Sequence, residues 1–209
     1  MGFAGSTTSF TRFRILDPVP RSLWLQLPDR LRKYAFRDID DTLEMSSCGW
    51  VSFEDMLDST WSGSPPLKAD YAFFSLRLDR RRIPAGIVKK YMLLAFIEET
   101  ERLRRQNKNF ISRERKKEIR EQVLARLRAR FLPVPGEFNV LWLMKKNEVW
   151  FASTQGSMLD LFLEEFLKTF ELHLEQLTPY SLASTVLDED SLARLDYLEP
   201  TCFTLNVIG

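Results

Sequence analysis

"YAFFSLRLDRRRIPAGIVKKYMLLAFIEETERLRRQN", residues 71–107, combines the pattern of a strand with that of a long helix. Phe74, Leu76 and Leu78 alternate with polar residues, which is typical of a strand with one buried face. Pro84 suits the first turn of a helix, where its missing N–H costs nothing, and no further helix breaker follows before Asn107. The stretch therefore predicts a strand followed by a helix about 36 Å long.

A second helix is expected directly after the first. The asparagines of "QNKNF" interrupt the helical pattern, Ser112 can cap a new helix, and Glu114 suits its positive N-terminus. This helix should run from about Arg113 to Arg130 and end before Pro133, because the residue before a proline avoids helical angles. Together the two helices predict a helical hairpin.

Both arms of this hairpin are apolar at the root and basic at the tip. In the first arm the apolar residues Ile87, Tyr91 and Leu94 precede a basic end. At 100° per residue, the second arm places basic and apolar residues on nearly the same arc: Arg113, Lys116, Lys117 and Arg120, then Leu124, Leu127 and Phe131. The hairpin should therefore project a charged tip from a packed base.

The net charge of +1 hides a strong asymmetry along the chain. Residues 77–130 hold 18 Lys and Arg against 7 Asp and Glu, a balance of +11. The remainder holds 12 basic and 22 acidic residues, a balance of −10. An asymmetry of this size indicates an anionic partner, for which nucleic acid and anionic membrane are the usual candidates.

Strand and helix patterns alternate on both sides of the hairpin. Before it, residues 9–16 predict a strand, and residues 21–36 predict helix on each side of Pro28 with Leu23, Leu25, Leu31 and Tyr34 facing inward. After it, "FNVLWLMKKNEVWFAST" predicts two strands that turn near Lys146 and Asn147. Ser157 should cap a helix from Met158 to Phe170 with the apolar face Leu159, Phe162, Leu163, Phe166 and Leu167, followed by a strand over "LHLEQL" and a last strand over "CFTLNVIG".

We expect an α+β protein whose antiparallel sheet body has two similar strand–helix–strand halves and a projecting basic helical hairpin. Its segments would be a flexible N-terminus (1–8), an N-terminal half (9–79), the hairpin (80–133), a second half (134–178) and an acidic tail (179–209).

Composition sets the class of protein. A chain of 209 residues with 44% hydrophobic residues can bury a core, which argues against disorder. No apolar run approaches the roughly 18 residues of a membrane span, and the N-terminus lacks the apolar core of a secretory signal, so we expect a cytoplasmic protein and no membrane partner. Cys48 and Cys202 are too few for a disulfide framework and are expected to be buried free thiols.

The residues give little support to catalysis. "RDIDD" offers Asp38, Asp40 and Asp41 as a carboxylate cluster, but a second acidic motif with suitable spacing is missing. His173 alternates with leucines in an expected strand and has no recognisable partner for base catalysis. One histidine and two cysteines are too few for the usual four-ligand structural zinc site, and no Gly-rich phosphate loop is present. We therefore expect no enzyme activity, no metal and no cofactor.

The order of features resembles the bacterial recombination-associated RdgC family over residues 9–178. The resemblance is carried by "CGWV" (48–51), "LDRRRIP" (78–84), "IVKKYMLLAFIEETERLRR" (87–105), "RERKKEIREQVLARLRARFLP" (113–133), and "LWLMKKNEVWFAST" (141–154) leading to "LDLFLEEFLKTF" (159–170). It implies a nucleoid-associated protein that binds DNA without base preference, forms a dimer able to close around duplex DNA, and limits the RecA recombinase. In that family the helical tip contacts its dimer mate through apolar residues, so the resemblance makes Phe131, with Leu132 beside it, the candidate dimer contact.

The basic residues of the hairpin region are the candidate DNA contacts. They are Arg80, Arg81, Arg82, Lys89, Lys90, Arg102, Arg104, Arg105, Lys108, Arg113, Lys116, Lys117 and Arg120. No helix-turn-helix, zinc finger or aromatic stacking platform is recognisable, which favours phosphate contact over base readout. Two alternatives stay open: a solvated helical surface without a partner, and an oligomeric interaction protein whose hairpin binds an acidic protein surface, including that of a second copy.

Overall fold

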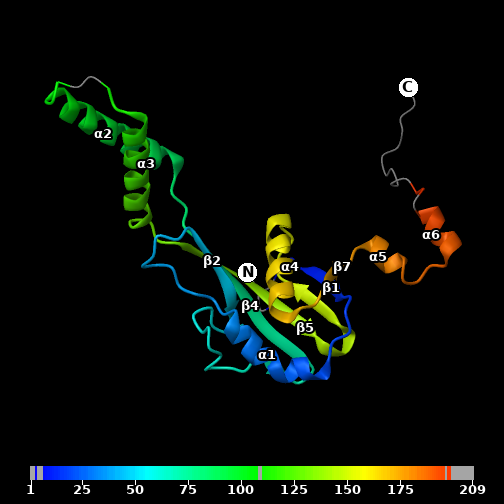
Figure 1. Ribbon diagram of the computed structural model, residues 1–209. Helices are drawn as coiled ribbons and strands as arrows, with labels where there is room; N and C mark the ends of the chain where they lie inside the picture. The colour runs from blue at the N-terminus through cyan, green and yellow to red at the C-terminus, as the bar shows by residue number, and fades with distance from the viewer. Residues whose placement is uncertain (1–2, 4–6, 108–109, 196, 199–209) are drawn as a thin grey trace, which may run out of the picture.

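The structure is a computed structural model that describes residues 3, 7–107, 110–195 and 197–198 (Figure 1). Its body is one antiparallel sheet of seven strands in the order β2-β4-β5-β6-β1-β7, with β3 paired to β4. The strands are β1 (Thr11–Ile15), β2 (Ser46–Val51), β3 (Leu67–Lys68), β4 (Tyr71–Arg80), β5 (Val134–Leu143), β6 (Glu148–Phe151) and β7 (Leu174–Gln176). The helices are α1 (Arg21–Lys33), α2 (Ala85–Arg104), α3 (Arg113–Arg128), α4 (Gly156–Phe170), α5 (Pro179–Ala183) and α6 (Glu189–Leu195), with a 3-10 turn at Met144–Lys146.

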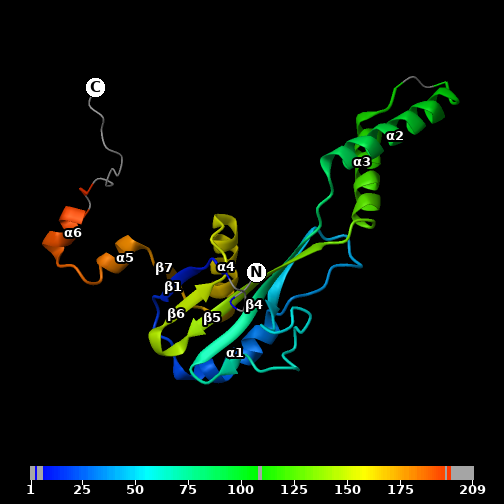
Figure 2. The same cartoon turned by 180° about the vertical axis from the view of Figure 1, so that it is seen from behind.

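The long strands β4 and β5 set the position of α2 and α3. They pair over ten residues, from Tyr71 opposite Leu143 to Arg80 opposite Val134. Because the chain leaves β4 and re-enters β5 at the same end of the sheet, everything between these strands must project from that end. Figures 1 and 2 show α2 and α3 as an arm that extends from the body there. We call α2 and α3 the helical arm.

The core lies between one face of the sheet and the helices α1 and α4. The α4 ring of Phe162 stacks on Phe151 of β6 with centroids 4.2 Å apart, and Trp142 of β5 packs against Phe166. The indole N–H of Trp50 donates a 2.7 Å hydrogen bond to the hydroxyl of Thr169, which satisfies the polar atom of a fully buried ring. The body is thus a two-layer α+β fold with helices packed on one face of the sheet around one aromatic core.

The opposite face of β4 is covered by loops and carries buried charges. The guanidinium of Arg77 donates to both carboxylate oxygens of Asp79, at 2.8 and 2.7 Å, and lies 4.1 Å from the ring centroid of Phe36. These hydrogen bonds raise the pKa of Arg77 above its ordinary value. Near them Gly49 passes so close to the backbone of Phe36 that an added Cβ would lie 2.5 Å from its Cα. Only glycine fits where β2 meets the chain after α1.

The predicted α+β class and antiparallel sheet are confirmed. The similarity of two halves stays a prediction. The sheet itself is continuous: β1, from the N-terminal segment, pairs with β6 and β7, which both come after the helical arm in the sequence. Helix is present on both sides of Pro28 as predicted: α1 continues through this residue and buries Leu23, Leu27 and Leu31 at a spacing of four residues. Leu25, expected inward, is exposed, since it points away from this stripe.

Two predictions about α4 can be compared with the structure. The N-cap of α4 is Gln155 without a side-chain cap, so the Ser157 cap was wrong; the buried face includes Phe162, Phe166 and Phe170, whereas Leu167 is exposed. α5 and α6 follow β7 at the end of the body away from the helical arm (Figure 1). The expected strand over "CFTLNVIG" and Cys202 lie outside the described residues, as does most of the expected flexible N-terminus. Within the described ranges, no helix is long and apolar enough to cross a membrane.

Candidate nucleic-acid interface

The helical arm begins and ends as its sequence dictates. The Ser112 hydroxyl accepts a hydrogen bond from the backbone N–H of Arg115, and Glu114 lies in the first turn of α3. Both helices have basic residues in the last turn, which suits the negative end of a helix dipole. The arm packs through a thin apolar seam: Ile119 and Leu127 of α3 are buried, whereas Glu99 is the only buried residue of α2 among those described.

An ion-pair network on one side of the arm joins the two helices. Glu99 accepts hydrogen bonds from Arg115 of α3, at 2.9 Å, and from Arg102 of its own helix, at 2.7 Å. Arg115 also donates to Glu118 at 2.8 Å. The hydrogen bonds from Arg115, and then those from Arg102, lower the pKa of Glu99, and its carboxylate raises the pKa of Arg115. This side of the arm is held together by its charges.

We expect the helical arm to loosen as pH falls. A carboxylate whose pKa is lowered in the folded state stabilises that state above its unfolded pKa of about 4.3 and loses this effect as pH falls through the lowered value. Hydrogen exchange of the α2 and α3 amides, corrected for intrinsic rates, should therefore accelerate relative to the sheet between about pH 5 and pH 3. In Glu99→Gln the exchange at neutral pH should already be faster, and its extra acceleration in acid should be smaller. An unchanged pH profile in this variant would contradict the role of Glu99.

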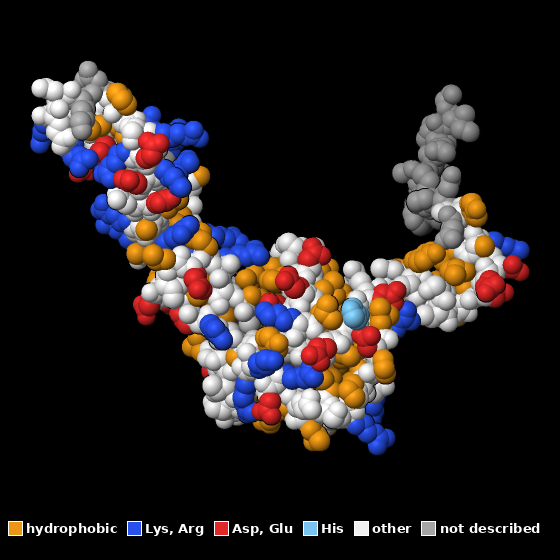
Figure 3. Space-filling view, in the orientation of Figure 1, with side chains coloured by type: hydrophobic (Ala, Val, Ile, Leu, Met, Phe, Trp, Pro, Cys, Tyr) orange, Lys and Arg blue, Asp and Glu red, His pale blue; other side chains and the backbone are white. Residues whose placement is uncertain are grey.

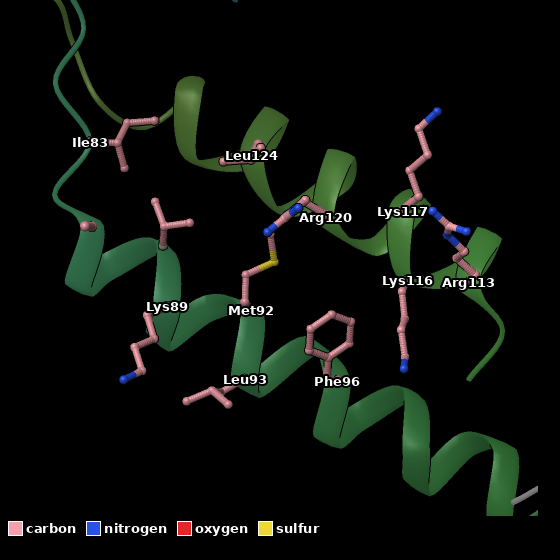
Figure 4. Close-up of a pocket in the computed structure, with 12 residues that line it drawn as sticks. Ile83, Lys89, Met92, Leu93, Phe96, Arg113, Lys116, Lys117, Arg120 and Leu124 are labelled. Atoms are coloured by element: carbon pink, nitrogen blue, oxygen red, sulfur yellow. The ribbon is translucent and has the colours of Figure 1, made fainter. Parts of the chain in front are cut away.

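The other side of the arm is an open groove between α2 and α3, with a volume of about 990 Å³ (Figure 4). We call it the basic groove. Its lining consists of an apolar set, Ile83, Ala85, Val88, Met92, Leu93, Phe96 and Leu124, and a basic set, Lys89, Arg113, Lys116, Lys117 and Arg120. In Figure 4 Met92 and Phe96 rise from α2 toward α3, while Arg120, Lys116 and Lys117 come from α3. No acidic residue is among the described residues of this lining.

The cations of the basic groove are available to an anionic ligand. Among the residues described, Lys89, Arg113, Lys116 and Arg120 take part in no ion pair. Lys117 has one exposed contact, 4.0 Å from Glu121 of the same helix. An exposed ion pair of this kind contributes little to the free energy of unfolding, and salt screens it further. The groove therefore presents its five cations to solvent, and Figure 3 shows Lys and Arg side chains gathered along the arm.

The structure separates the predicted DNA contacts into groups. Five of them line the basic groove, namely Lys89, Arg113, Lys116, Lys117 and Arg120. Arg80, Arg82, Lys90, Arg104 and Arg105 are exposed outside that lining. Arg102 is bound to Glu99 on the opposite side of the arm, and Lys108 lies outside the described residues.

Arg81 was wrongly predicted to contact DNA. It is only 3% exposed, and its guanidinium donates to four backbone carbonyls of one loop: Ile39 at 2.8 Å, Asp40 at 3.2 Å, Thr42 at 2.7 Å and Glu44 at 3.0 Å. A guanidinium that is buried and whose two terminal nitrogens donate to backbone carbonyls is not available to a phosphate. Arg81 instead fixes the 39–45 loop against the base of the helical arm.

The proposed dimer contacts lie at the root of the arm. Phe131 and Leu132 follow α3 where the chain returns to β5; Phe131 is half-buried and Leu132 is exposed. The exposed aromatic residue in the connection between α2 and α3 is Phe110. A role of Phe131 and Leu132 in dimer formation stays a prediction.

The carboxylates and the histidine examined for catalysis are dispersed. Asp38 accepts a hydrogen bond from the backbone of Asp40 within an exposed loop, and no metal-binding cluster of His, Cys, Asp or Glu occurs among the described residues. His173 is exposed and lies 3.0 Å from the carboxylate of Asp17. A backbone hydrogen bond from His173 lowers the pKa of Asp17.

Cys48 is a half-buried free thiol whose pKa is raised to about 12 by burial.

The sequence prediction missed the apolar floor of the basic groove. The sequence pattern predicted that Ile87, Tyr91 and Leu94 form the apolar face of α2. In the structure, the floor is formed by Val88, Met92 and Phe96. These residues also recur every four positions, so the signal was present. Two apolar stripes run side by side on α2, and periodicity alone does not tell which one faces the partner helix.

Two comparisons bear on the family of this chain. No protein-family model matches the chain, and no curated protein matches it.

Proposed function

We propose that the protein binds duplex DNA without base preference, through phosphate contacts made by the basic groove and the exposed cations around it. The observation that carries this proposal is the set of five cations that line the groove. Four of these cations form no ion pair with a described residue, and no carboxylate is among the described residues of the lining. Duplex DNA carries one negative charge per about 1.7 Å of axis, so a row of cations on a projecting arm can neutralise several phosphates at once. We propose no catalytic activity.

A salt titration tests this proposal directly. Fluorescence anisotropy with labelled duplexes of unrelated sequence should give similar affinities, because phosphate contacts carry no sequence information. Five phosphate contacts predict that the logarithm of the binding constant falls with the logarithm of salt concentration at a slope of about −4.5. Absence of binding at low salt would refute the proposal, and strong preference for one sequence would refute the phosphate-based mechanism.

The resemblance to RdgC supports a more specific version of this function. In that version the protein is a nucleoid-associated homodimer, and the body of each subunit has two similar halves. It limits RecA by occupying the duplex. Strand exchange by RecA should then slow as the protein is added, and the slowing should disappear at salt concentrations that release the protein from DNA. Slowing that persists after release would point to direct contact with the recombinase.

A second candidate function is binding to an acidic protein surface. It is favoured by exposed apolar residues on α2, since Leu93, Leu94 and Ile97 are 54%, 51% and 56% exposed on one stretch of helix. Exposed apolar surface of this kind marks protein contacts more often than DNA contacts. The salt titration separates the two functions, because the second predicts no binding to DNA.

A further inference from the structure

Phosphate contacts leave the floor of the basic groove unexplained. A phosphate can bind the cations on the walls, but it gains nothing from Val88, Met92 and Phe96 beneath them. A volume of about 990 Å³ is large enough for several side chains of a peptide. The ligand that would satisfy both parts of the groove carries acidic and apolar side chains together.

This chain contains a segment of that chemistry. Residues 186–198, "VLDEDSLARLDYL", hold four acidic residues and one basic residue, a balance of −3, opposite in sign to the groove. We call it the C-terminal acidic segment. Asp188 caps α6 by accepting a hydrogen bond from the backbone N–H of Ser191 at 3.0 Å, so Glu189 and Asp190 lie in the first helical turn.

The apolar side chains of this segment are unusually exposed. Val186 and Tyr197 are 83% and 87% exposed, and Leu187 and Leu198 are also exposed on either side of α6. A free monomer gains nothing by presenting four large apolar residues to water, and exposed apolar residues of this kind can mark an interaction surface. In Figure 3 the end of the molecule that carries α5 and α6 shows hydrophobic and acidic side chains together, opposite the basic arm.

We propose that the C-terminal acidic segment of one copy docks into the basic groove of a second copy, and that the second copy returns the same contact. The arm and the segment extend from opposite ends of the body in both views (Figures 1 and 2). The sheet order explains this, because β7, which leads to the segment, is the strand at one edge, and β4, which leads to the arm, lies on the far side of the sheet. Two copies related by a two-fold axis can exchange segments and close into a dimer with both contacts satisfied.

Charge reversal on the two surfaces tests the exchange. One variant carries Lys116→Glu and Arg120→Glu in the groove, and the other carries Glu189→Lys and Asp190→Lys in the segment; all four residues are exposed. Sedimentation at low salt and without DNA should show a wild-type dimer and should show each variant weakened in self-association by about 100-fold, since like charges then face each other. An equimolar mixture of the two variants should recover dimers, because a reversed groove meets a reversed segment and a normal groove meets a normal segment.

A control variant and the mixture together decide the outcome. Arg21→Glu with Lys146→Glu changes the net charge equally on exposed residues of the body and should dimerise like wild type. A wild-type chain that stays monomeric would overturn the proposal, as would dimers that neither variant weakens or variants that fail to recover on mixing. Unchanged thermal transitions would show that all variants fold. The segment and DNA would occupy the same groove in alternation, so added duplex should displace the segment. The exchange is measured without DNA, so a failed exchange and a failed DNA titration are separate results.

Discussion

Replacing Asp79 with Ala should lower the free energy of unfolding by about 3–5 kcal/mol, the usual cost of leaving one partner of a buried ion pair alone. The carboxylate of Asp79 accepts both hydrogen bonds of the Arg77 guanidinium, and both residues are buried beneath loops on the face of β4 opposite the aromatic core. Without Asp79, the cation keeps one hydrogen bond, to the carbonyl of Met56 at 3.2 Å, the ring of Phe36 and the more distant charges of Asp38 and Asp40. Urea denaturation should show a lower midpoint with an unchanged slope.

A matched variant on an exposed pair gives the reference for this result. Asp29 pairs with Arg32 at 3.0 Å on the surface of α1, so Asp29→Ala should cost only about 0–1 kcal/mol. A double variant, Arg77→Met with Asp79→Leu, removes both charges and should be more stable than Asp79→Ala. If Asp79→Ala unfolds at the same urea concentration as Asp29→Ala, the buried pair contributes nothing particular to the fold.

Reversing three cations of the basic groove should lower duplex affinity by about 100-fold or more and reduce the salt slope by about three units. The variant is Lys116→Glu with Lys117→Glu and Arg120→Glu, all on exposed positions of α3. Among the described residues, the only ion pair that it disrupts is the long contact between Lys117 and Glu121, so the thermal transition should stay nearly unchanged. Anisotropy titration with the same duplexes measures the effect.

The control for this experiment separates local contacts from overall charge. Arg21→Glu with Arg37→Glu and Lys146→Glu changes the net charge by the same amount, on exposed residues of the body without an ion pair among those described. It should reduce affinity only modestly, through long-range repulsion, and leave the slope near the wild-type value. Equal losses in the two triple variants would show that the basic groove is not the DNA contact.

Local sequence patterns predicted most elements because local physics decides them. Alternating Phe74, Leu76 and Leu78 fix the buried face of β4, and their side chains lie in the core as expected. Ser112 begins α3 because its hydroxyl can satisfy a free N–H of the first turn. Asn147 adopts the left-handed conformation in the turn between β5 and β6, as the expected hairpin required.

The candidate site could be predicted only in part, because equal residues have unequal environments. Arg80, Arg81 and Arg82 are adjacent and chemically identical, yet Arg81 lies on the same side of the chain as Arg77 and Asp79 and is covered by the 39–45 loop. Likewise Arg102 is bound to Glu99, whereas Lys116 faces an open groove. The distinction depends on segments distant in sequence.

The sequence by itself determined the strand that turns into a long helix, the capped second helix and the uneven division of charge, since periodicity, caps and composition act within a few residues of each other. Only the tertiary structure decided which cations remain free. Hydrogen bonds reach about 3 Å, so the partner of each guanidinium depends on how β4 meets the 39–45 loop and how α2 meets α3. The same packing joined apolar and basic residues into one groove.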